Sequence, residues 1–187
     1  MVGPFKRAQG GFTHLFVAID KFSKWIEAKS VVTIMADKVR DYFINIVHQF
    51  GVPNRNITDN GTQFTVGVFK DICEDFGTKI CYASVVQVER ANVMVLQGIK
   101  VRVFDRQRPY VGRWVDELPS VLWSFRTTPS QATGQSPFFL VYKAETMLLS
   151  EMEFESLRVR NFNEERPEQD RANDLNRLQE AREAALI

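Results

Sequence analysis

The chain has 187 residues, of which 44% are hydrophobic and 12% aromatic, so it can bury one ordinary globular core and is not expected to be disordered. Its 24 Lys and Arg residues are balanced by 23 Asp and Glu residues, so the net charge does not indicate a polyanionic partner. No apolar run approaches the roughly eighteen residues of a membrane-spanning helix, which excludes a membrane span at this stage.

The first strands are expected near the N-terminus. Residues 12–19 form an almost continuous β-prone apolar run, and residues 24–30 alternate in part between apolar and polar side chains. The two runs should pair as a hairpin across a turn at residues 21–23. Asp20 lies at the edge of this turn, where a local hydrogen bond is its expected role.

Residues 33–50 predict a long amphipathic helix. Thr33 suits its N-cap, and Gly51 directly follows the last apolar residue, as is common at a helix C-terminus. The apolar stripe with helical spacing consists of Met35, Val39, Tyr42, Phe43, Ile46, Val47 and Phe50.

The middle of the chain alternates short strands and helices. Residues 56–58 predict a strand that ends at Asp59, and because a helix precedes it, a right-handed crossover implies parallel pairing. A helix over residues 69–76, ended by Gly77, precedes a strand over residues 79–83.

Helices dominate the second half of the predicted fold. Residues 87–104 and 111–126 carry helical periodicity, the latter with Pro119 inside, which gives the element order ββαβαβαα. Residues 127–136 should form a loop, and the apolar segment 137–142 should pack back onto the fold.

The C-terminal part differs in character. Residues 1–148 should form the folded domain, and residues 149–187 a charged extension that is helical or partly disordered. Within it, residues 164–185 carry only a sparse apolar stripe, typical of a marginal amphipathic helix or a solvated tail.

The cysteines and histidines indicate no structural zinc site. Cys73 and Cys81 follow no recognisable signal segment, so buried free thiols in a reducing intracellular setting are expected. His14 and His48 lie near no pair of closely spaced cysteines, so tetrahedral zinc has no ligand set.

Two carboxylates are the strongest indication of chemistry. Asp59 follows a predicted strand and Glu89 precedes a predicted helix, and a third acid beside them could complete a divalent metal site over a phosphodiester. Taken alone, Asp59 is more often a turn residue, and Glu89 more often a first-turn acid that favours a helix N-terminus. The position of Asp59 beyond the carboxyl end of a strand favours a ligand site.

Several segments share their order with a known family: Val2–Phe5, Ala18–Trp25, Ile57–Phe64, Gln87–Asn92 and Thr127–Pro129 through Pro137–Phe138. Together, along essentially the whole chain, they resemble the integrase core of gypsy-type long-terminal-repeat retrotransposons, particularly those of plants, within the retroviral integrase superfamily.

The resemblance implies an α/β protein with a ribonuclease-H-like fold, a central mixed sheet flanked by helices. It also implies two Mg²⁺ or Mn²⁺ ions, held by two aspartates and a glutamate, that process DNA ends and join them to target DNA. Asp59 matches the second family acid and Glu89 the third. The first family acid lies on the first strand just before Val2, so with Met1 at the intervening position we expect a truncated first strand without that acid.

The interval between the two acids departs from the family. Twenty-nine residues separate Asp59 from Glu89, fewer than the family usually has, and the loss falls around Val85–Gln87. Two carboxylates would leave two neighbouring divalent ions under-neutralised. We therefore expect impaired catalysis.

DNA contact could persist without catalysis. Arg90, Lys100 and Arg102 lie along the predicted helix that starts near Glu89, where they could pair with phosphates, although a solvated basic face explains them equally well.

The leading hypothesis is a catalytically impaired integrase core whose partners are DNA, both element ends and target, with homodimers possible and no membrane. The alternatives are a non-catalytic nucleic-acid-binding or dimerising module and a ribonuclease-H-like nuclease. The expected location is intracellular, and nuclear if the protein is functional.

Overall fold

The structure, a computed structural model, describes residues 1–58, 61, 64, 67–82, 92–100, 113–131, 133–144, 146, 173, 176 and 180. The chain divides into two compact units. The first unit comprises Met1–Ala18 and Ile26–Leu122, and the second comprises Ile19–Trp25 and Trp123–Ile187. The boundary expected near residue 148 falls outside the described residues and stays a prediction.

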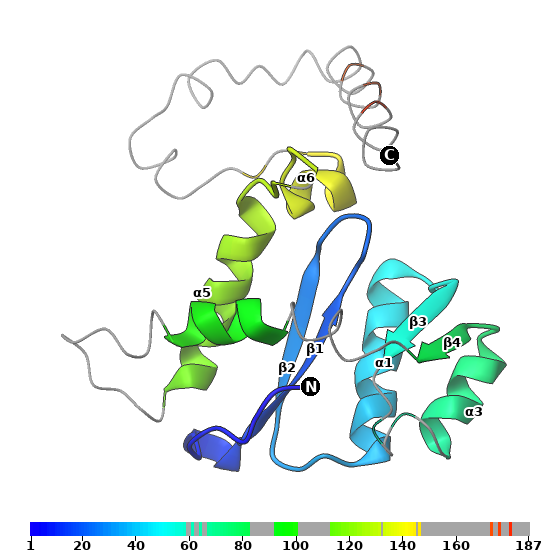
Figure 1. Cartoon of the computed structure of the whole chain (residues 1–187), viewed down its shortest axis with the longest axis vertical. Helices are drawn as coiled ribbons and strands as arrows, with labels where there is room; N and C mark the ends of the chain where they lie inside the picture. The colour runs from blue at the N-terminus through cyan, green and yellow to red at the C-terminus, as the bar shows by residue number, and fades with distance from the viewer. Residues whose placement is uncertain are drawn as a thin grey trace. The chain divides into compact units, whose positions relative to one another are not determined.

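The predicted hairpin is confirmed. After a short 3-10 turn, η1 (Gln9–Gly11), strands β1 (His14–Ile19) and β2 (Ile26–Val31) pair with each other and run side by side in Figure 1. An isolated antiparallel bridge joins Val2 to Leu15 of β1 through two backbone hydrogen bonds of 3.0 and 2.8 Å. Val2 therefore occupies a third strand position beside β1.

The long helix begins later than the sequence predicted. Helix α1 spans Ala36–Phe50, and its N-cap is Met35, not Thr33. Met35 is extended and supplies its backbone carbonyl to the N–H groups of Lys38 and Val39, at 3.1 and 3.2 Å, with no side-chain cap. The prediction of Thr33 was wrong because the chain bends at Val32 and Thr33 and the helix begins only after the extended residue Met35. At the other end Gly51, with φ 84°, terminates the helix as predicted.

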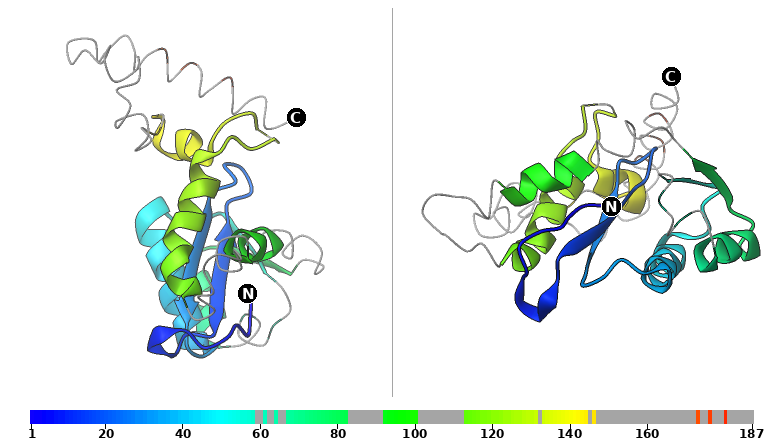
Figure 2. Two further views of the ribbon diagram at one scale, coloured as in Figure 1. Left: turned by 90° about the vertical axis from the view of Figure 1, so that its left-hand side faces the viewer. Right: turned by 60° about the horizontal axis from the view of Figure 1, so that its bottom comes forward.

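The strand–helix–strand unit that follows is confirmed. Strand β3 (Arg55–Thr58) pairs in parallel with β4 (Lys79–Tyr82), and helix α3 (Val68–Asp75) connects them. Figure 1 and the right-hand view of Figure 2 place β3 beside β4 with α3 next to them. Parallel strands need such a crossover because the end of the first strand and the start of the second lie at opposite edges of the sheet.

Apolar side chains from β1, β2, α1 and α3 form the core of the first unit. At the centre of this core Phe43 meets Phe69 edge-on, with ring centroids 5.6 Å apart. The buried members are Phe16, Val31, Val39, Phe43, Val47, Phe69 and Cys73. The predicted stripe of α1 is thus confirmed at its centre, whereas its two ends, Met35 and Phe50, are exposed.

The described strands comprise both antiparallel and parallel pairs, arranged as two two-stranded sheets. Residues 92–100 form a helix in the same unit, which agrees with part of the helix predicted over residues 87–104. The rest of that predicted helix lies outside the described residues.

The second unit contains the end of α5 and a helix that the sequence analysis treated only as an apolar segment. Helix α5 spans Trp114–Thr127 with Pro119 inside it, and α6 spans Pro137–Tyr142. The oxygen of Ser136 caps α6 by accepting a hydrogen bond from the Phe139 N–H at 3.1 Å. Ser136 followed by Pro137 is a helix-start signal that could have predicted α6.

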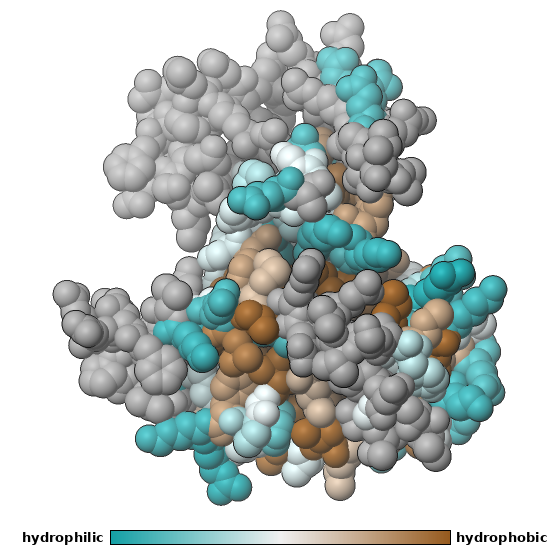
Figure 3. Space-filling model, viewed as in Figure 1, coloured by the Kyte–Doolittle hydropathy of each residue, from teal (hydrophilic) through white to brown (hydrophobic). Residues whose placement is uncertain are grey.

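Among the residues that the structure describes, no helix is both long and apolar enough to cross a membrane. The face drawn in Figure 3 instead shows apolar residues, in brown, interspersed with hydrophilic ones, in teal. In the charged C-terminal stretch, residues 173, 176 and 180 are helical and exposed.

Candidate functional site

The carboxyl end of β3 leads into the first candidate acid. Thr58, the last residue of β3, is only 7% exposed and lies in register with Tyr82 at the same end of β4. Asp59 follows Thr58 directly in the chain and itself lies outside the described residues. The structure therefore places the start of this segment at the carboxyl edge of a parallel strand pair, where ligands of open α/β sheets collect.

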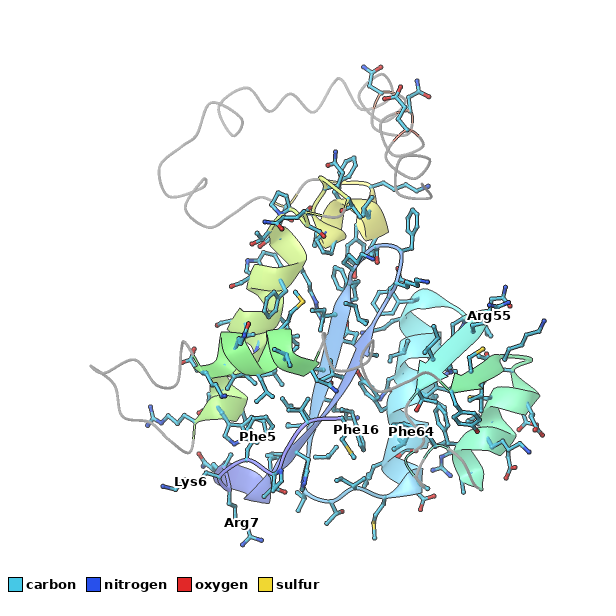
Figure 4. The ribbon with its side chains drawn as sticks, in the orientation of Figure 1. Phe5, Lys6, Arg7, Phe16, Arg55 and Phe64 are labelled. Atoms are coloured by element: carbon cyan, nitrogen blue, oxygen red, sulfur yellow. The ribbon has the colours of Figure 1, made fainter. Side chains whose placement is uncertain are left out.

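The far end of the same segment is anchored in the core. The ring of Phe64 meets the ring of Phe69 at 5.4 Å and 76°, and the N–H of Phe64 donates to the carbonyl of Gly61 at 2.9 Å. Figure 4 labels Phe64 and Phe16, which both belong to the packing around the core of the first unit. Because Thr58 and Phe64 are both held, the short segment between them has fixed ends.

The second candidate acid precedes an anchored helix. Within residues 92–100, Val95 is fully buried and Ile99 is 3% exposed, and the Asn92 amide donates to the Met1 carbonyl at 3.5 Å. Glu89 lies three residues before Asn92 and outside the described residues. The pairing of Asp59 with Glu89 at one metal site therefore stays a prediction.

Of the three basic residues predicted to meet DNA, the structure describes one. Lys100 is exposed at the end of the described helical segment. Its neighbours Val95 and Ile99 are buried, so the helix presents its lysine away from the packed side. Arg90 and Arg102 lie outside the described residues.

Asp20 has the turn role that was expected. Its Oδ2 atom accepts hydrogen bonds from the Ser23 N–H at 2.8 Å and the Ser23 hydroxyl at 2.6 Å. The Asp20 backbone also pairs with Trp25 and Lys24 across the turn at 2.9 Å each. These contacts account for the aspartate without a metal ion.

The donor chemistry of the two predicted acids suits a hard cation. Carboxylate oxygens are the ligands that Mg²⁺ and Mn²⁺ prefer. Over the described ranges, which contain neither Asp59 nor Glu89, no three His, Cys, Asp or Glu side chains gather as a metal-binding group. The metal site at Asp59 and Glu89 stays a prediction.

Both cysteines are free thiols, as predicted, but only Cys73 is buried, and the expected burial of Cys81 was wrong. Burial raises the pKa of the Cys73 thiol, an effect partly opposed by the Asn56 amide, which donates to its sulfur at 3.6 Å. Cys73 therefore acts as a small apolar core residue beside β3.

The basic pair Lys6 and Arg7 was not identified from the sequence, and it lies beside two stacked aromatic rings. Phe5 stacks on Trp114 with ring centroids 4.6 Å apart, and the Trp114 indole N–H donates to the Lys6 carbonyl at 2.9 Å. Lys6 and Arg7 are exposed, and in Figure 4 their side chains extend away from the ribbon. The sequence signal for this group was two adjacent basic residues after Phe5. The contact with Trp114 could not be predicted, because Trp114 lies far away in the chain.

The profile of the family described as "Integrase core domain" matches residues 2–87. These residues are an integrase core domain. The matched range includes β1 to β4 and Asp59, and it ends two residues before Glu89.

Relatives of this integrase core domain include both a cellular protein and a viral polyprotein. "Gypsy retrotransposon integrase-like protein 1" of Bos taurus is 27% identical over 145 residues, 76% of this chain and 29% of that protein. The "Gag-Pol polyprotein" of avian reticuloendotheliosis virus is 34% identical over 143 residues, 72% of this chain and 12% of that protein. The chain thus spans less than a third of the length of either relative.

Solved structures of similar shape are also integrases. The HTLV-2 integrase catalytic core domain in complex with magnesium, in its trimeric form, matches with a TM-score of 0.55 and 19% identity, over 68% of this chain and 82% of that one. The intasome of simian T-cell lymphotropic virus in complex with the PP2A regulatory subunit B56 gamma matches with a TM-score of 0.61 and 14% identity, over 76% and 52%. The ribonuclease-H-like α/β fold of the integrase core is thereby confirmed.

Proposed function

We propose that this chain serves DNA integration as the core of a retroelement integrase, with element ends and target DNA as its ligands. The observation that carries the proposal is the parallel strand β3, which ends at Thr58 directly before Asp59 within the matched range. This location at the carboxyl edge of a sheet suits a ligand-binding acid.

Asp59 and Glu89 are the residues that we propose hold the divalent metal. Their carboxylates match the hard-cation chemistry of Mg²⁺ or Mn²⁺, and a related core was solved in complex with magnesium. When bound, such ions polarise a phosphodiester and stabilise the attacking and leaving oxygens. Thr58, directly before Asp59 in the chain, is buried at the carboxyl end of β3, and Phe64 packs on Phe69.

We further propose that this copy is catalytically impaired. The impairment is inferred from the twenty-nine residues between Asp59 and Glu89, an interval shorter than the resemblance implies. A shorter connection restricts the approach of the second acid to the first. Misplacement of a metal ligand by about 1 Å is enough to cost on the order of a hundredfold in rate.

Strand-transfer and end-processing assays with Mn²⁺ test the catalytic part. We expect this chain to form little product, and Asp59→Asn to remove what remains. Robust product that depends on Asp59 would overturn the impairment and support the integrase function. Product that is unaffected by Asp59→Asn would contradict the proposed site, and cleavage of an RNA–DNA hybrid in preference to DNA would favour a nuclease.

DNA binding is expected to persist without catalysis, through Lys100 together with Arg90 and Arg102. Removal of one phosphate contact by Lys100→Ala should weaken duplex binding and lower the magnitude of the salt slope by about 1. The matched control is Lys79→Ala, because Lys79 is also exposed but lies at the opposite end of β4 from Tyr82. A gel-shift series across salt concentrations measures both variants, and equal effects of the two would contradict a specific role for Lys100.

Assembly and location complete the proposal. Related cores were solved in dimeric and trimeric forms, which supports homodimerisation here. A protein that joins DNA to chromosomal target DNA must reach the nucleus in a nucleated cell. Sedimentation of the purified chain tests the dimer, and imaging of a tagged chain tests the location.

A further inference from the structure

The second unit contains an aromatic cluster that the proposed integrase chemistry does not use. The cluster consists of Trp25, Trp123, Phe138 and Tyr142, from the hairpin tip, α5 and α6. Phe138 lies at its centre, with ring centroids 4.8 Å from Tyr142, 6.1 Å from Trp123 and 6.4 Å from Trp25. Trp25 also meets Tyr142 edge-on at 5.5 Å.

The exposure of these rings is unusual. Trp25 is only 6% exposed, but Trp123 is 46% and Tyr142 52% exposed. Two large rings on either side of Phe138 therefore present surface to solvent. Exposed aromatic groups of this size are typical of a binding surface, because burial would otherwise stabilise the fold.

The cluster is held in place by hydrogen bonds on each contributing segment. The Trp25 N–H donates to the Ser23 hydroxyl at 3.2 Å, and the Trp25 carbonyl accepts from the Asp20 N–H at 2.9 Å. On α5 the Thr127 hydroxyl donates to the Trp123 carbonyl at 2.9 Å, and on α6 Ser136 caps the first turn. Rings supported in this way need little ordering when a ligand binds.

Basic residues accompany the rings, one in contact with Trp25 and two next to ring residues in the chain. The Arg126 guanidinium lies 4.4 Å from the centroid of Trp25, Lys24 directly precedes Trp25, and Lys143 directly follows Tyr142. Over residues 19–25 and the described part of 123–144, the charged residues are four bases and one acid. The acid is Asp20, whose carboxylate accepts two hydrogen bonds from Ser23. The ligand that fits such a surface is an anion with flat rings.

We propose that the aromatic cluster binds single-stranded DNA by stacking unpaired bases on Trp123 and Tyr142, with Arg126, Lys24 and Lys143 near the phosphates. Aromatic rings among basic groups are the combination that recognises unpaired nucleic acid without sequence preference. Bases within a duplex are already stacked on each other, so the rings discriminate against duplex DNA. The inference rests on the proposed function only for the choice of DNA over RNA.

Tryptophan fluorescence provides a direct test. Of the three tryptophans, Trp25 and Trp114 are buried and Trp123 is half exposed, so a base that stacks on the cluster should quench mainly Trp123. The probe is an oligothymidylate of about 12 nucleotides, titrated at low salt with EDTA into the whole chain, beside a blunt duplex of equal length. Saturable quenching by the single strand and weaker quenching by the duplex are expected. Absence of quenching by the single strand would overturn the proposal.

Variants then separate stacking from simple apolar contact. Trp123→Leu keeps an apolar side chain but removes the ring, and it should weaken single-strand binding on the order of tenfold, whereas Trp123→Phe should retain most of the affinity. The matched control is Phe50→Leu, an aromatic residue 39% exposed on α1, which should bind as the unchanged chain does. Fluorescence anisotropy of labelled oligothymidylate measures all three, since it does not need Trp123.

Wild-type affinity of Trp123→Leu for the single strand would overturn the proposal. If sedimentation then shows that Trp123→Leu also changes the oligomeric state of the protein, a second copy of the chain covers the cluster instead of DNA. Equal duplex binding by Lys100→Ala and Lys79→Ala, with intact quenching at Trp123, would count against the proposed DNA contact alone. Weakened duplex binding by Lys100→Ala, with no quenching at Trp123 by the single strand, would count against this inference alone.

Discussion

The core of the first unit and the aromatic cluster of the second unit both contain edge-to-face ring contacts, but their rings differ in exposure to solvent. Phe43 meets Phe69 at 5.6 Å and 69°, and Trp123 meets Phe138 at 6.1 Å and 67°. The two phenylalanines in the core are each 5% exposed, whereas Trp123 is 46% exposed. An edge-to-face contact therefore does not by itself identify a core, and exposure decides whether a ring mainly stabilises the fold or remains available to a ligand.

The largest expected effect comes from removing a core ring. Phe43→Ala should lower the free energy of unfolding by about 3–5 kcal/mol, because it leaves a cavity between α1 and α3. Trp123→Ala removes a larger side chain but should cost only about 1 kcal/mol, since its ring is already half hydrated. Urea denaturation measures both. Equal losses would show that the aromatic cluster is part of the stabilising core.

The two cysteines also differ in burial, and their reactivity should differ accordingly. Cys73 is fully buried in the core and its pKa is raised by burial, whereas Cys81 on β4 is partly exposed. A raised pKa lowers the thiolate fraction, so iodoacetamide at pH 8 should label Cys81 at least about tenfold faster than Cys73, a difference of about 1.4 kcal/mol.

The contrast between the thiols should shrink in two conditions. Higher pH brings the Cys73 thiol closer to its raised pKa, and urea removes its burial. Mass spectrometry of timed samples gives both rates, with Cys81→Ser as the control that isolates Cys73. Comparable labelling of the two cysteines in the folded protein would contradict a closed core at α3.

The smallest effect concerns the helix that presents half of the aromatic cluster. Ser136→Ala removes the oxygen that caps α6 and should lower the free energy of unfolding by about 1 kcal/mol. It should also weaken single-strand binding slightly, because Phe138 and Tyr142 both lie on α6. Ser136→Asp keeps an acceptor and is the matched control. Identical melting of the two variants would show that the cap does not support the cluster.

Much of the first unit could be predicted from short stretches of sequence. Gly51 directly follows α1, Gly77 comes just after the C-cap of α3, and the apolar stripe of α1 identified the buried residues at its centre. These features depend on periodicity and on helix ends, which are local. The partner of β3 was not predicted: β3 pairs in parallel with β4, through α3, and among the described residues not with a strand that precedes α1.

The errors and omissions arose where a distant partner or a backbone group acts. Thr33 was a reasonable N-cap, but it lies in a bend after β2, and the carbonyl of Met35 accepts the first hydrogen bonds of α1. Helix α6 was not predicted, although Ser136 and Pro137 are a recognisable start. For the candidate site, the sequence indicated Asp59, and the structure contributes the anchors Thr58 and Phe64 on either side of it.

By itself the sequence determined the family, the order of the elements in the first unit and the acids to which the chemistry is assigned, because motifs and periodicity are carried by neighbouring residues. Only the tertiary structure decided that Trp25, Trp123, Phe138 and Tyr142 form one cluster, and that Phe5 and Trp114 hold Lys6 in place. The physical reason is that stacking and exposure depend on distances across the fold. Residues far apart in the chain acquire these properties only when packing brings them together.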